Sequence, residues 1–217
     1  MRFRSRKQAG QELAVRLLEW ASSGDLANVT VLALPRGGVP VGAEIARALA
    51  VPLDVLVVRK IGVPGSPEVG IGAIVGDDPP VFDRTGLQAM HLSEDKLGPD
   101  IARERVELHR RERLYRGGRA APDISGHGVV VVDDGLATGI TARAALRHLR
   151  RGGPLRLTLA VPVCGHATAA ALRDEADDVI SLLQPQHLRS VGEWYEDFHQ
   201  VTDEEVLHAL RELHPAG

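Results

Sequence analysis

The sequence predicts an α/β fold in which a central parallel β-sheet is flanked by helices. Short runs rich in Val, Leu and Ile alternate with segments of helical character, which is typical of parallel sheets built with right-handed crossovers. Hydrophobic residues make up 44% of the 217 residues but aromatic residues only 3%, so the core must consist mainly of aliphatic side chains. The run of valines at 129–132 indicates a strand buried on both faces.

The first half of the chain is predicted to begin with a helix at residues 6–22, because apolar side chains recur there near helical spacing. The Gly and Pro content of Gly62–Gly72 predicts a loop. Mixed charges and strong helix formers predict a long, partly exposed helix at residues 93–116. The remaining elements are strands at Val29–Leu34, Leu53–Val58 and Ile71–Val75, a helix at Val41–Ala50 and a turn at Asp77–Pro80.

The second half is predicted to continue as strand, loop and helix in turn. Gly117 and Gly118 end the charged helix, and Arg119–His127 is a linker to the valine strand. Thr202 and Glu205 form a capping box, which predicts a last helix at residues 203–213. Between these lie helices at Ala142–Arg151 and Ala167–Glu175 and strands at Leu155–Val163 and Val179–Leu183.

The length suits a single domain covering residues 1–217. The net charge of -3 provides no basic field, so we do not expect a nucleic-acid partner. No apolar run is long enough to span a bilayer, and no apolar stretch follows the basic start, so we expect a soluble cytoplasmic protein without membrane contact. The sequence leaves open whether the chain works as a monomer or a homodimer.

The segment richest in chemistry runs from Val129 to Thr141. A buried strand brings Asp133 and Asp134 to its carboxyl end, where ligands bind in parallel sheets. These carboxylates can accept hydrogen bonds from the vicinal hydroxyls of a sugar. The next residues are mostly small or hydroxylated, and a helix then begins whose N–H groups and dipole suit a phosphate. An ordinary Asp-Asp-Gly turn is the alternative interpretation.

This segment resembles the signature with which type I phosphoribosyltransferases bind 5-phosphoribosyl pyrophosphate (PRPP), and the resemblance extends over all positions from Val129 to Thr141. It implies that Asp133 and Asp134 bind the 2- and 3-hydroxyls of the ribose. It places the 5-phosphate at Ala137, Thr138, Gly139, Ile140 and Thr141. It also implies the type I phosphoribosyltransferase fold, with a small hood drawn from residues 1–25, 76–125 and 184–217.

Two further segments resemble PRPP-binding parts of the family. Leu34–Gly38 follows the first strand, and the matching loop of the family binds pyrophosphate and often holds a cis peptide bond. Arg36 and Gly37 are therefore the candidate pyrophosphate ligands, since a guanidinium suits phosphate oxygens. Arg59 and Lys60, followed by a Pro-Gly pair, resemble an arrangement of adenine phosphoribosyltransferases in which the basic pair approaches PRPP. The alternatives are a turn with a solvated arginine and two surface charges at a strand end.

The Gly62–Gly72 loop is the candidate for a lid that excludes water from the reacting centre. Glu68 is its only acidic residue and is a candidate for handling a proton of the base. Ala137 lies where hypoxanthine–guanine enzymes place an Asp that meets the base, whereas the adenine, uracil and orotate branches have no Asp there. The resemblance therefore argues against a 6-oxopurine acceptor.

Two other features are interpreted as structural. Cys164 is expected to be a buried small residue rather than a nucleophile, and as the only cysteine it excludes a disulfide within the chain. The neighbouring aromatic residues Trp194, Tyr195 and Phe198 are expected to pack the last helix onto the sheet rather than to stack on a base.

The reaction implied by the resemblance is displacement of pyrophosphate from the anomeric carbon of PRPP by a nitrogen of a nucleobase. The candidate catalytic residues are Arg36, Glu68, Asp133 and Asp134. Mg²⁺ is the expected cofactor, held mainly by substrate oxygens, with Asp133 and Asp134 as candidate protein ligands. Two alternatives stay open, namely a PRPP-binding regulator with weak catalysis and a hydrolase that directs water to the same carbon.

Overall fold

A five-stranded parallel sheet forms the centre of the computed structural model, which describes residues 2–21 and 28–213. Its strands pair in the order β2-β1-β6-β7-β8, so the α/β fold class predicted from the sequence is confirmed. Their bounds are β1 (Val29–Ala33), β2 (Leu53–Val55), β6 (Gly128–Val132), β7 (Arg156–Val163) and β8 (Asp178–Leu183).

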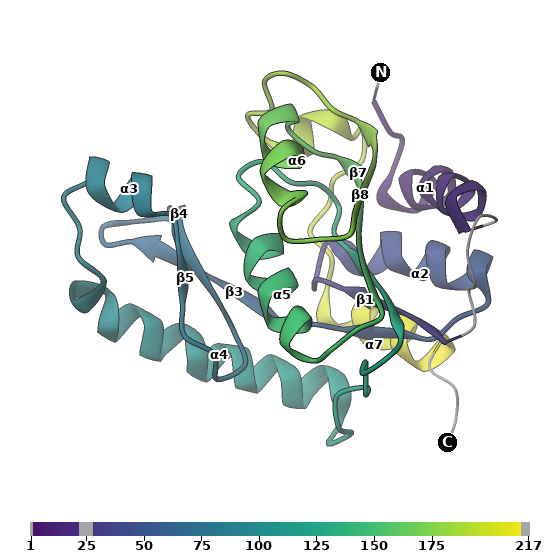
Figure 1. Ribbon diagram of the computed structural model, residues 1–217, viewed down its shortest axis with the longest axis horizontal. Helices are drawn as coiled ribbons and strands as arrows, with labels where there is room; N and C mark the ends of the chain where they lie inside the picture. The colour runs from purple at the N-terminus through teal and green to yellow at the C-terminus, as the bar shows by residue number, and fades with distance from the viewer. Residues whose placement is uncertain (1, 22–27, 214–217) are drawn as a thin grey trace.

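Helices cover both faces of this sheet (Figure 1), and alternate side chains of the strands point to opposite faces. Val130 and Val132 belong to the core cluster on the side of α1 (Arg6–Ala21), α2 (Gly38–Leu49) and α7 (Asp203–Leu213). Val129 and Val131 belong to the cluster on the side of α5 (Ile140–Arg151) and α6 (His166–Leu172). The valine run is thus buried on both faces, as the sequence predicted.

A second, antiparallel sheet extends away from the first (Figure 1) and corrects the predicted loop at Gly62–Gly72. That segment is most of a hairpin between β3 (Val58–Val63) and β4 (Ser66–Val75), and β5 (Val81–Phe82) pairs with β4. The hairpin reverses at Pro64-Gly65, where Gly65 has a φ of 81°, as the third position of a type II turn requires. Position 72 has no room for a side chain, since a Cβ there would lie 2.7 Å from the Phe82 ring.

The predicted strand Leu53–Val58 is also wrong, because two strands of different sheets share it. β2 ends at Val55, and after Leu56 and Val57 the chain enters β3 of the antiparallel sheet. Leu56 and Val57 are both buried, so their apolar character gave no sign that the chain leaves the parallel sheet between them. Arg59 and Lys60 consequently lie inside a strand of the second sheet, not at the end of a parallel strand.

Most other predicted elements are confirmed, with shifts at their ends. The charged helix is α4 (Gly98–Arg116), preceded by a short 3-10 helix, η1 (Glu94–Leu97), and it ends at Gly117 in the left-handed conformation. The capping box is present, since Thr202 N donates to Glu205 Oε2 at 2.7 Å and Glu205 N donates to Thr202 Oγ1 at 3.2 Å. The short helix α3 (Arg84–Ala89) was not predicted.

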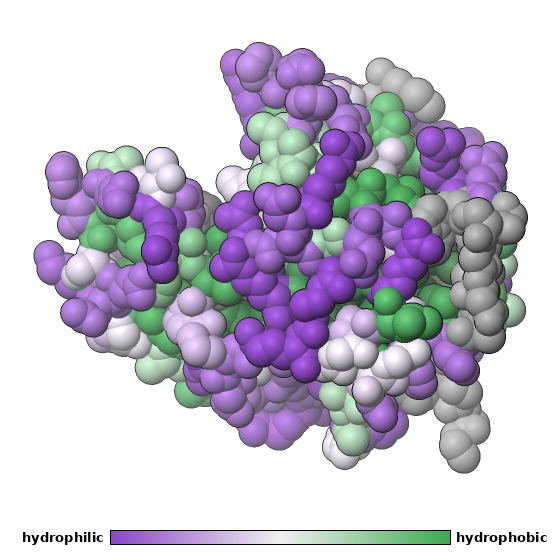
Figure 2. All heavy atoms as spheres, viewed as in Figure 1, coloured by the Kyte–Doolittle hydropathy of each residue, from purple (hydrophilic) through white to green (hydrophobic). Residues whose placement is uncertain are grey.

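The surface seen in Figure 2 is largely hydrophilic and is hollowed between the part that carries α3 and the side formed by α5 and α6. Within residues 2–21 and 28–213, no helix combines the length and apolar character that crossing a membrane requires.

One substitution in β7 and one directly before it test the packing of the core. Leu159 is 0% exposed in β7, whereas Leu155, just before the strand, is 79% exposed. Leu159→Ala is expected to lower the free energy of unfolding by about 2–5 kcal/mol, because it removes buried methyl groups and leaves a cavity. Leu155→Ala is expected to change it by less than about 0.5 kcal/mol. Urea denaturation followed by circular dichroism measures both, and equal effects would contradict the assigned burial.

Candidate active site at the carboxyl edge of the parallel sheet

Two of the predicted loops meet at the carboxyl ends of β1 and β6. These strands are neighbours in parallel register, with Ala33 opposite Val132, and Leu34 N donates to Val132 O at 2.8 Å. The strand order runs from β1 to β2 on one side and from β6 to β8 on the other, so the loops lie at the switch point of the sheet. Ligands of open parallel sheets bind in the crevice at this point.

The contact between the two loops is so close that only glycine fits. A Cβ on Gly37 would lie 2.2 Å from Asp134 Oδ2, and one on Gly38 would lie 2.5 Å from Val132 O. Gly37 has an ordinary helical φ of -59°, so its lack of a side chain serves the close approach rather than backbone freedom. The peptide bond between Pro35 and Arg36 is cis, as the resemblance in the sequence led us to expect.

The same edge brings together the N-termini of α2 and α5. The residues before these helices are Gly37 and Gly139, and neither helix has a side-chain cap on its first N–H groups. At the start of α2, Gly38 N donates to Leu34 O at 3.0 Å, Val39 N donates to Arg36 O at 3.1 Å, and Pro40 has no N–H, so this helix contributes mainly its dipole. At the start of α5 the first N–H groups have no acceptor within the helix, and together with the dipole they attract anions. Gly139 takes the left-handed conformation, with a φ of 71°, and Thr138 beside it is exposed. The start of α5 can therefore receive an anionic group, and the dipole of α2 favours a second one nearby.

Asp133 and Asp134 carry the negative charge of the site. Asp133 Oδ1 accepts a hydrogen bond from the N–H of Asp134 at 2.9 Å. Burial raises the pKa of Asp133 well above its usual range, and the neighbouring charge of Asp134 raises it further. Burial also raises the pKa of Asp134, but the guanidinium of Arg6 opposes that rise. The Asp134 side chain keeps 13% of its surface exposed, so a ligand can reach it.

Arg6 is the site residue that sequence reasoning missed. Its Nε donates to Asp134 Oδ2 at 2.7 Å, and its Nη1 donates to the carbonyl oxygen of His199 at 2.8 Å. The sequence signal was only a basic start, which does not distinguish Arg6 from the exposed Arg2 and Arg4. Contact between residues 128 positions apart depends on the fold and not on any local pattern.

The aromatic cluster is structural, as predicted, but it packs a different segment. The ring centroids of Tyr195 and Phe3 are 5.5 Å apart, and those of Tyr195 and Phe198 are 5.1 Å apart. Tyr195 also donates its hydroxyl to Asp134 O at 2.6 Å. The cluster therefore fastens the N-terminal segment beside the acidic pair, whereas the sequence suggested that it held the last helix.

Arg36 lies at the mouth of the site, with its side chain 24% exposed. Its Nη1 is 3.6 Å from Asp203 Oδ1, and Asp203 also accepts the Tyr115 hydroxyl at 2.6 Å. Since 3.6 Å exceeds hydrogen-bond distance, Asp203 holds the guanidinium electrostatically and leaves its donors to other partners.

The structure separates the predicted basic pair. Arg59 is held by Glu104 of α4, to which its Nε and Nη2 donate at 2.9 and 2.7 Å. Lys60 is exposed, and its positive charge acts on both Asp133 and Asp134. Adjacent residues of a strand point to opposite faces, which explains the separation. The backbone of Glu68 lies in β4, but its side chain falls outside the described part of the structure.

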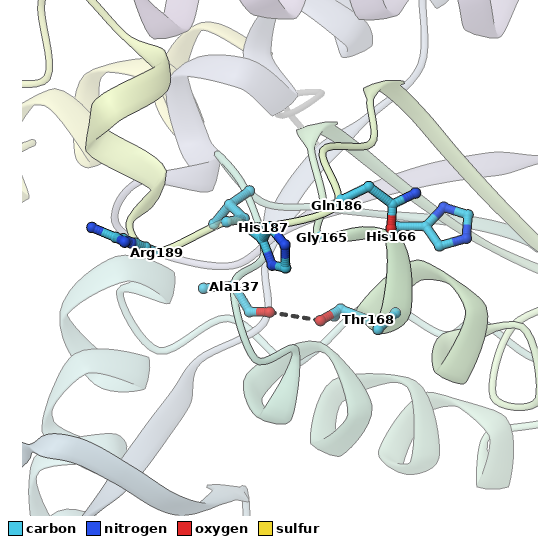
Figure 3. Close-up of a pocket in the computed structure, with 9 residues that line it drawn as sticks. Ala137, Gly165, His166, Thr168, Gln186, His187 and Arg189 are labelled. Atoms are coloured by element: carbon cyan, nitrogen blue, oxygen red, sulfur yellow. Dashed lines mark hydrogen bonds between the residues drawn. The ribbon is translucent and has the colours of Figure 1, made fainter.

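A pocket of about 560 Å³ lies beside the Asp133–Thr141 loop, which contributes Ala137 to its wall (Figure 3). Figure 3 shows His187 above Ala137, with Arg189 and His166 on opposite sides. Thr168 Oγ1 donates to Ala137 O at 2.6 Å and so fixes the loop at the pocket wall. The pocket is lined by Ala137, Gly165, His166, Ala167, Thr168, Gln186, His187, Leu188 and Arg189.

Two other chemical groups are accounted for. Cys164 is fully buried, and burial raises the pKa of its thiol to about 11, which fits a packing residue as predicted. The described residues contain no group of three or more His, Cys, Asp and Glu side chains that could hold a metal ion. Asp133 and Asp134 nevertheless suit Mg²⁺, which binds through one or two carboxylates together with substrate phosphates.

The chain is similar to known proteins over most of its length. The model of the phosphoribosyl transferase domain matches residues 6–196. Two curated relatives from Mycobacterium tuberculosis, of strains CDC 1551 and H37Rv, are each 40% identical over 212 residues and carry provisional phosphoribosyl transferase names. The matches cover 98% of this chain and 47% of each relative, so the chain spans about half the length of these relatives.

Solved structures give the same fold. The crystal structure of the TT1426 protein from Thermus thermophilus is 40% identical, has a TM-score of 0.79, and is matched over 99% of this chain and 100% of that one. The AQ2163 protein from Aquifex aeolicus is 11% identical with a TM-score of 0.54, over 86% of this chain and 78% of that one. This second likeness concerns the fold alone.

A substitution of Gly37 tests the close contact between the two loops. Gly37→Ala is expected to lower the free energy of unfolding by about 1–3 kcal/mol, because the added methyl group would overlap the Asp134 carboxylate. Gly98→Ala is the matched control, since a Cβ at that helix start meets no atom within 4 Å. The control is expected to change stability by less than about 1 kcal/mol. Chemical denaturation measures both variants, and a Gly37→Ala variant as stable as Gly98→Ala would contradict the contact.

Proposed function

The chain belongs to the phosphoribosyl transferase domain family, and we propose that it transfers the 5-phosphoribosyl group of PRPP to a nitrogenous base with release of pyrophosphate. The observation that carries this proposal is the meeting of Asp133 and Asp134 with the N-termini of α2 and α5. PRPP has a vicinal diol flanked by a phosphate and a pyrophosphate. The site offers carboxylates for a diol between two anion-binding helix starts.

Each part of PRPP has a matching group in this proposal. Asp133 and Asp134 accept hydrogen bonds from the ribose hydroxyls. The start of α5 holds the 5-phosphate through backbone N–H groups and through the hydroxyls of Thr138 and Thr141. The start of α2 and Arg36 hold the pyrophosphate, and Lys60 adds positive charge from the second sheet. Arg59 would have to leave Glu104 to join them.

The proposed reaction requires little covalent chemistry from the protein. The chain holds the ribose and the incoming base in position, and Arg36 with the α2 N-terminus stabilises the charge that develops on the departing pyrophosphate. Mg²⁺ bound to substrate oxygens beside Asp133 and Asp134 would supply further positive charge for the leaving group. Glu68 stays a candidate for accepting a proton from the base.

The pocket beside Ala137 is the proposed place of the acceptor base. It adjoins the loop assigned to the 5-phosphate, and its volume of about 560 Å³ falls in the range of small-molecule pockets. Gln186, His187 and Arg189 give it polar groups that can select hydrogen-bonding edges of a base. Ala137 contributes no carboxylate, in agreement with an acceptor other than a 6-oxopurine.

The arrangement of the remaining chain completes the proposal. We assign residues 1–217 to one phosphoribosyltransferase domain, with hood elements in 1–25, 76–125 and 184–217, and with the β3–β4 hairpin as the candidate lid. The single, buried cysteine fits a cytoplasmic location, where thiols stay reduced.

Calorimetric titration with PRPP, with and without Mg²⁺, followed by a pyrophosphate-release screen over bases, tests the proposed function. Mg²⁺-dependent binding and release of pyrophosphate with one base is the expected result. Release without any base would identify a PRPP hydrolase, and binding without release under all conditions would identify a regulator. No binding of PRPP would contradict the assignment of the Asp133–Thr141 loop.

A substitution of Arg36 tests the pyrophosphate end of the site separately. Arg36→Ala is expected to weaken PRPP binding about tenfold or more, because it removes charge-assisted hydrogen bonds to phosphate oxygens. Ribose 5-phosphate lacks the pyrophosphate and serves as the matched ligand control, so its binding is expected to change less than about threefold. Calorimetry measures both affinities. Equal losses for the two ligands would contradict the assignment of Arg36 to pyrophosphate.

A further inference from the structure

We propose that Arg6 is a positioning residue that holds the Asp134 carboxylate in the orientation needed to bind the ribose diol. The inference rests on the proposed function, since it concerns the same acidic pair. It adds a residue from the far end of the chain that acts through Asp134, without itself contacting the sugar.

The geometry fixes one oxygen of Asp134 and leaves the other available. Arg6 Nε is 2.7 Å from Oδ2, and the two side chains are only 9% and 13% exposed. Gly37 packs against the same carboxylate, because a Cβ there would lie 2.2 Å from Oδ2 and 3.2 Å from Oδ1. Tyr195 holds the backbone of the residue through its 2.6 Å hydrogen bond to Asp134 O. Within the described residues only Oδ2 has a side-chain hydrogen-bond partner, so we assign Oδ1 to the hydroxyl of a ligand.

Arg6 is itself locked by contacts that only a guanidinium can make together. Its Nη1 donates to the His199 carbonyl oxygen at 2.8 Å, and its Cζ lies 3.8 Å from the centroid of the Phe198 ring. A planar fork can stack on a ring and donate in two directions at once, whereas the lysine ammonium is a single point charge. Phe198 and His199 thus hold the Arg6 guanidinium in place, and Arg6 in turn orients the Asp134 carboxylate.

The charge of Arg6 serves the same end. Asp133 and Asp134 are adjacent and largely buried, and the negative charge of Asp134 repels that of Asp133. Arg6 and Lys60 are the cations whose charges act on both of them, and only Arg6 is in direct contact. Without Arg6, the Asp134 carboxyl would lose both its hydrogen bond and its nearest positive charge.

Two segments that lie far apart in the sequence build this support. Phe3 N donates to Trp194 O and Glu196 N donates to Phe3 O, each at 2.8 Å, so the N-terminal segment pairs with residues 194–196. This pairing places Arg6 between Asp134 and Phe198. The N-terminal segment has no group that binds the diol, but through Arg6 it orients the carboxylate that does.

A double-mutant cycle on PRPP affinity, measured by calorimetry, tests whether Arg6 acts through Asp134. Arg6→Gln and Asp134→Asn are each expected to weaken binding about tenfold or more. If Arg6 works only through Asp134, the double variant should bind within about threefold of Asp134→Asn alone. Losses that multiply would overturn the proposal, since they would show that Arg6 acts independently.

Two further variants serve as controls, and thermal unfolding checks that the variants are folded. Arg4→Gln makes the same change on an exposed side chain of the same segment and is expected to leave affinity unchanged. Arg6→Lys is expected to bind with intermediate affinity, and it replaces Arg6→Gln in the cycle if thermal unfolding shows that Arg6→Gln is not folded. Full affinity in Arg6→Lys or Arg6→Gln would overturn the proposal.

The wild-type titration separates this inference from the proposed function. If the wild-type chain does not bind PRPP, both fail together. If it binds PRPP and the cycle shows independent effects, only the role of Arg6 fails.

Discussion

The contact between the loops after β1 and β6 is the constraint on which the site depends. Gly37 and Gly38 let one loop lie directly against the backbone and carboxylate of the other, at the switch point of the parallel sheet. Because the strands are in register, this contact also aligns the starts of α2 and α5. The absence of side chains at Gly37 and Gly38 thereby lets an acidic pair lie close to the N-termini of two helices, whose dipoles favour anions.

Positive and negative side chains gather at the carboxyl edge of the parallel sheet. Burial disfavours the charges of both Asp133 and Asp134, and the charge of Asp134 adds to this effect at Asp133, while Arg6 and Lys60 favour both charges. Arg36 is held near Asp203 at a distance that leaves its donors free for an anion. A ligand that carries both hydroxyls and phosphates satisfies these groups together. This explains why the family match and the geometry lead to the same proposal.

The sequence was most informative where a function is encoded within a few consecutive residues. The valine run, the acidic pair and the capping box of Thr202 and Glu205 each fold as local rules predict. It was least informative where the reason is tertiary. Gly72 indicated a loop, but it is small because Phe82 lies over it, and Leu56 gave no sign that one apolar run serves two sheets. Arg6 contacts Asp134 only because the fold brings together residues that are 128 positions apart.

A crystal structure of the chain with PRPP and Mg²⁺ tests the central claim most directly. We expect the ribose hydroxyls on Asp133 and Asp134, the 5-phosphate at the start of α5 and the pyrophosphate at the start of α2. The Arg6–Asp134 pair should persist with Oδ1 on the ligand. PRPP bound at any other edge of the sheet, or with its phosphates away from both helix starts, would contradict the account.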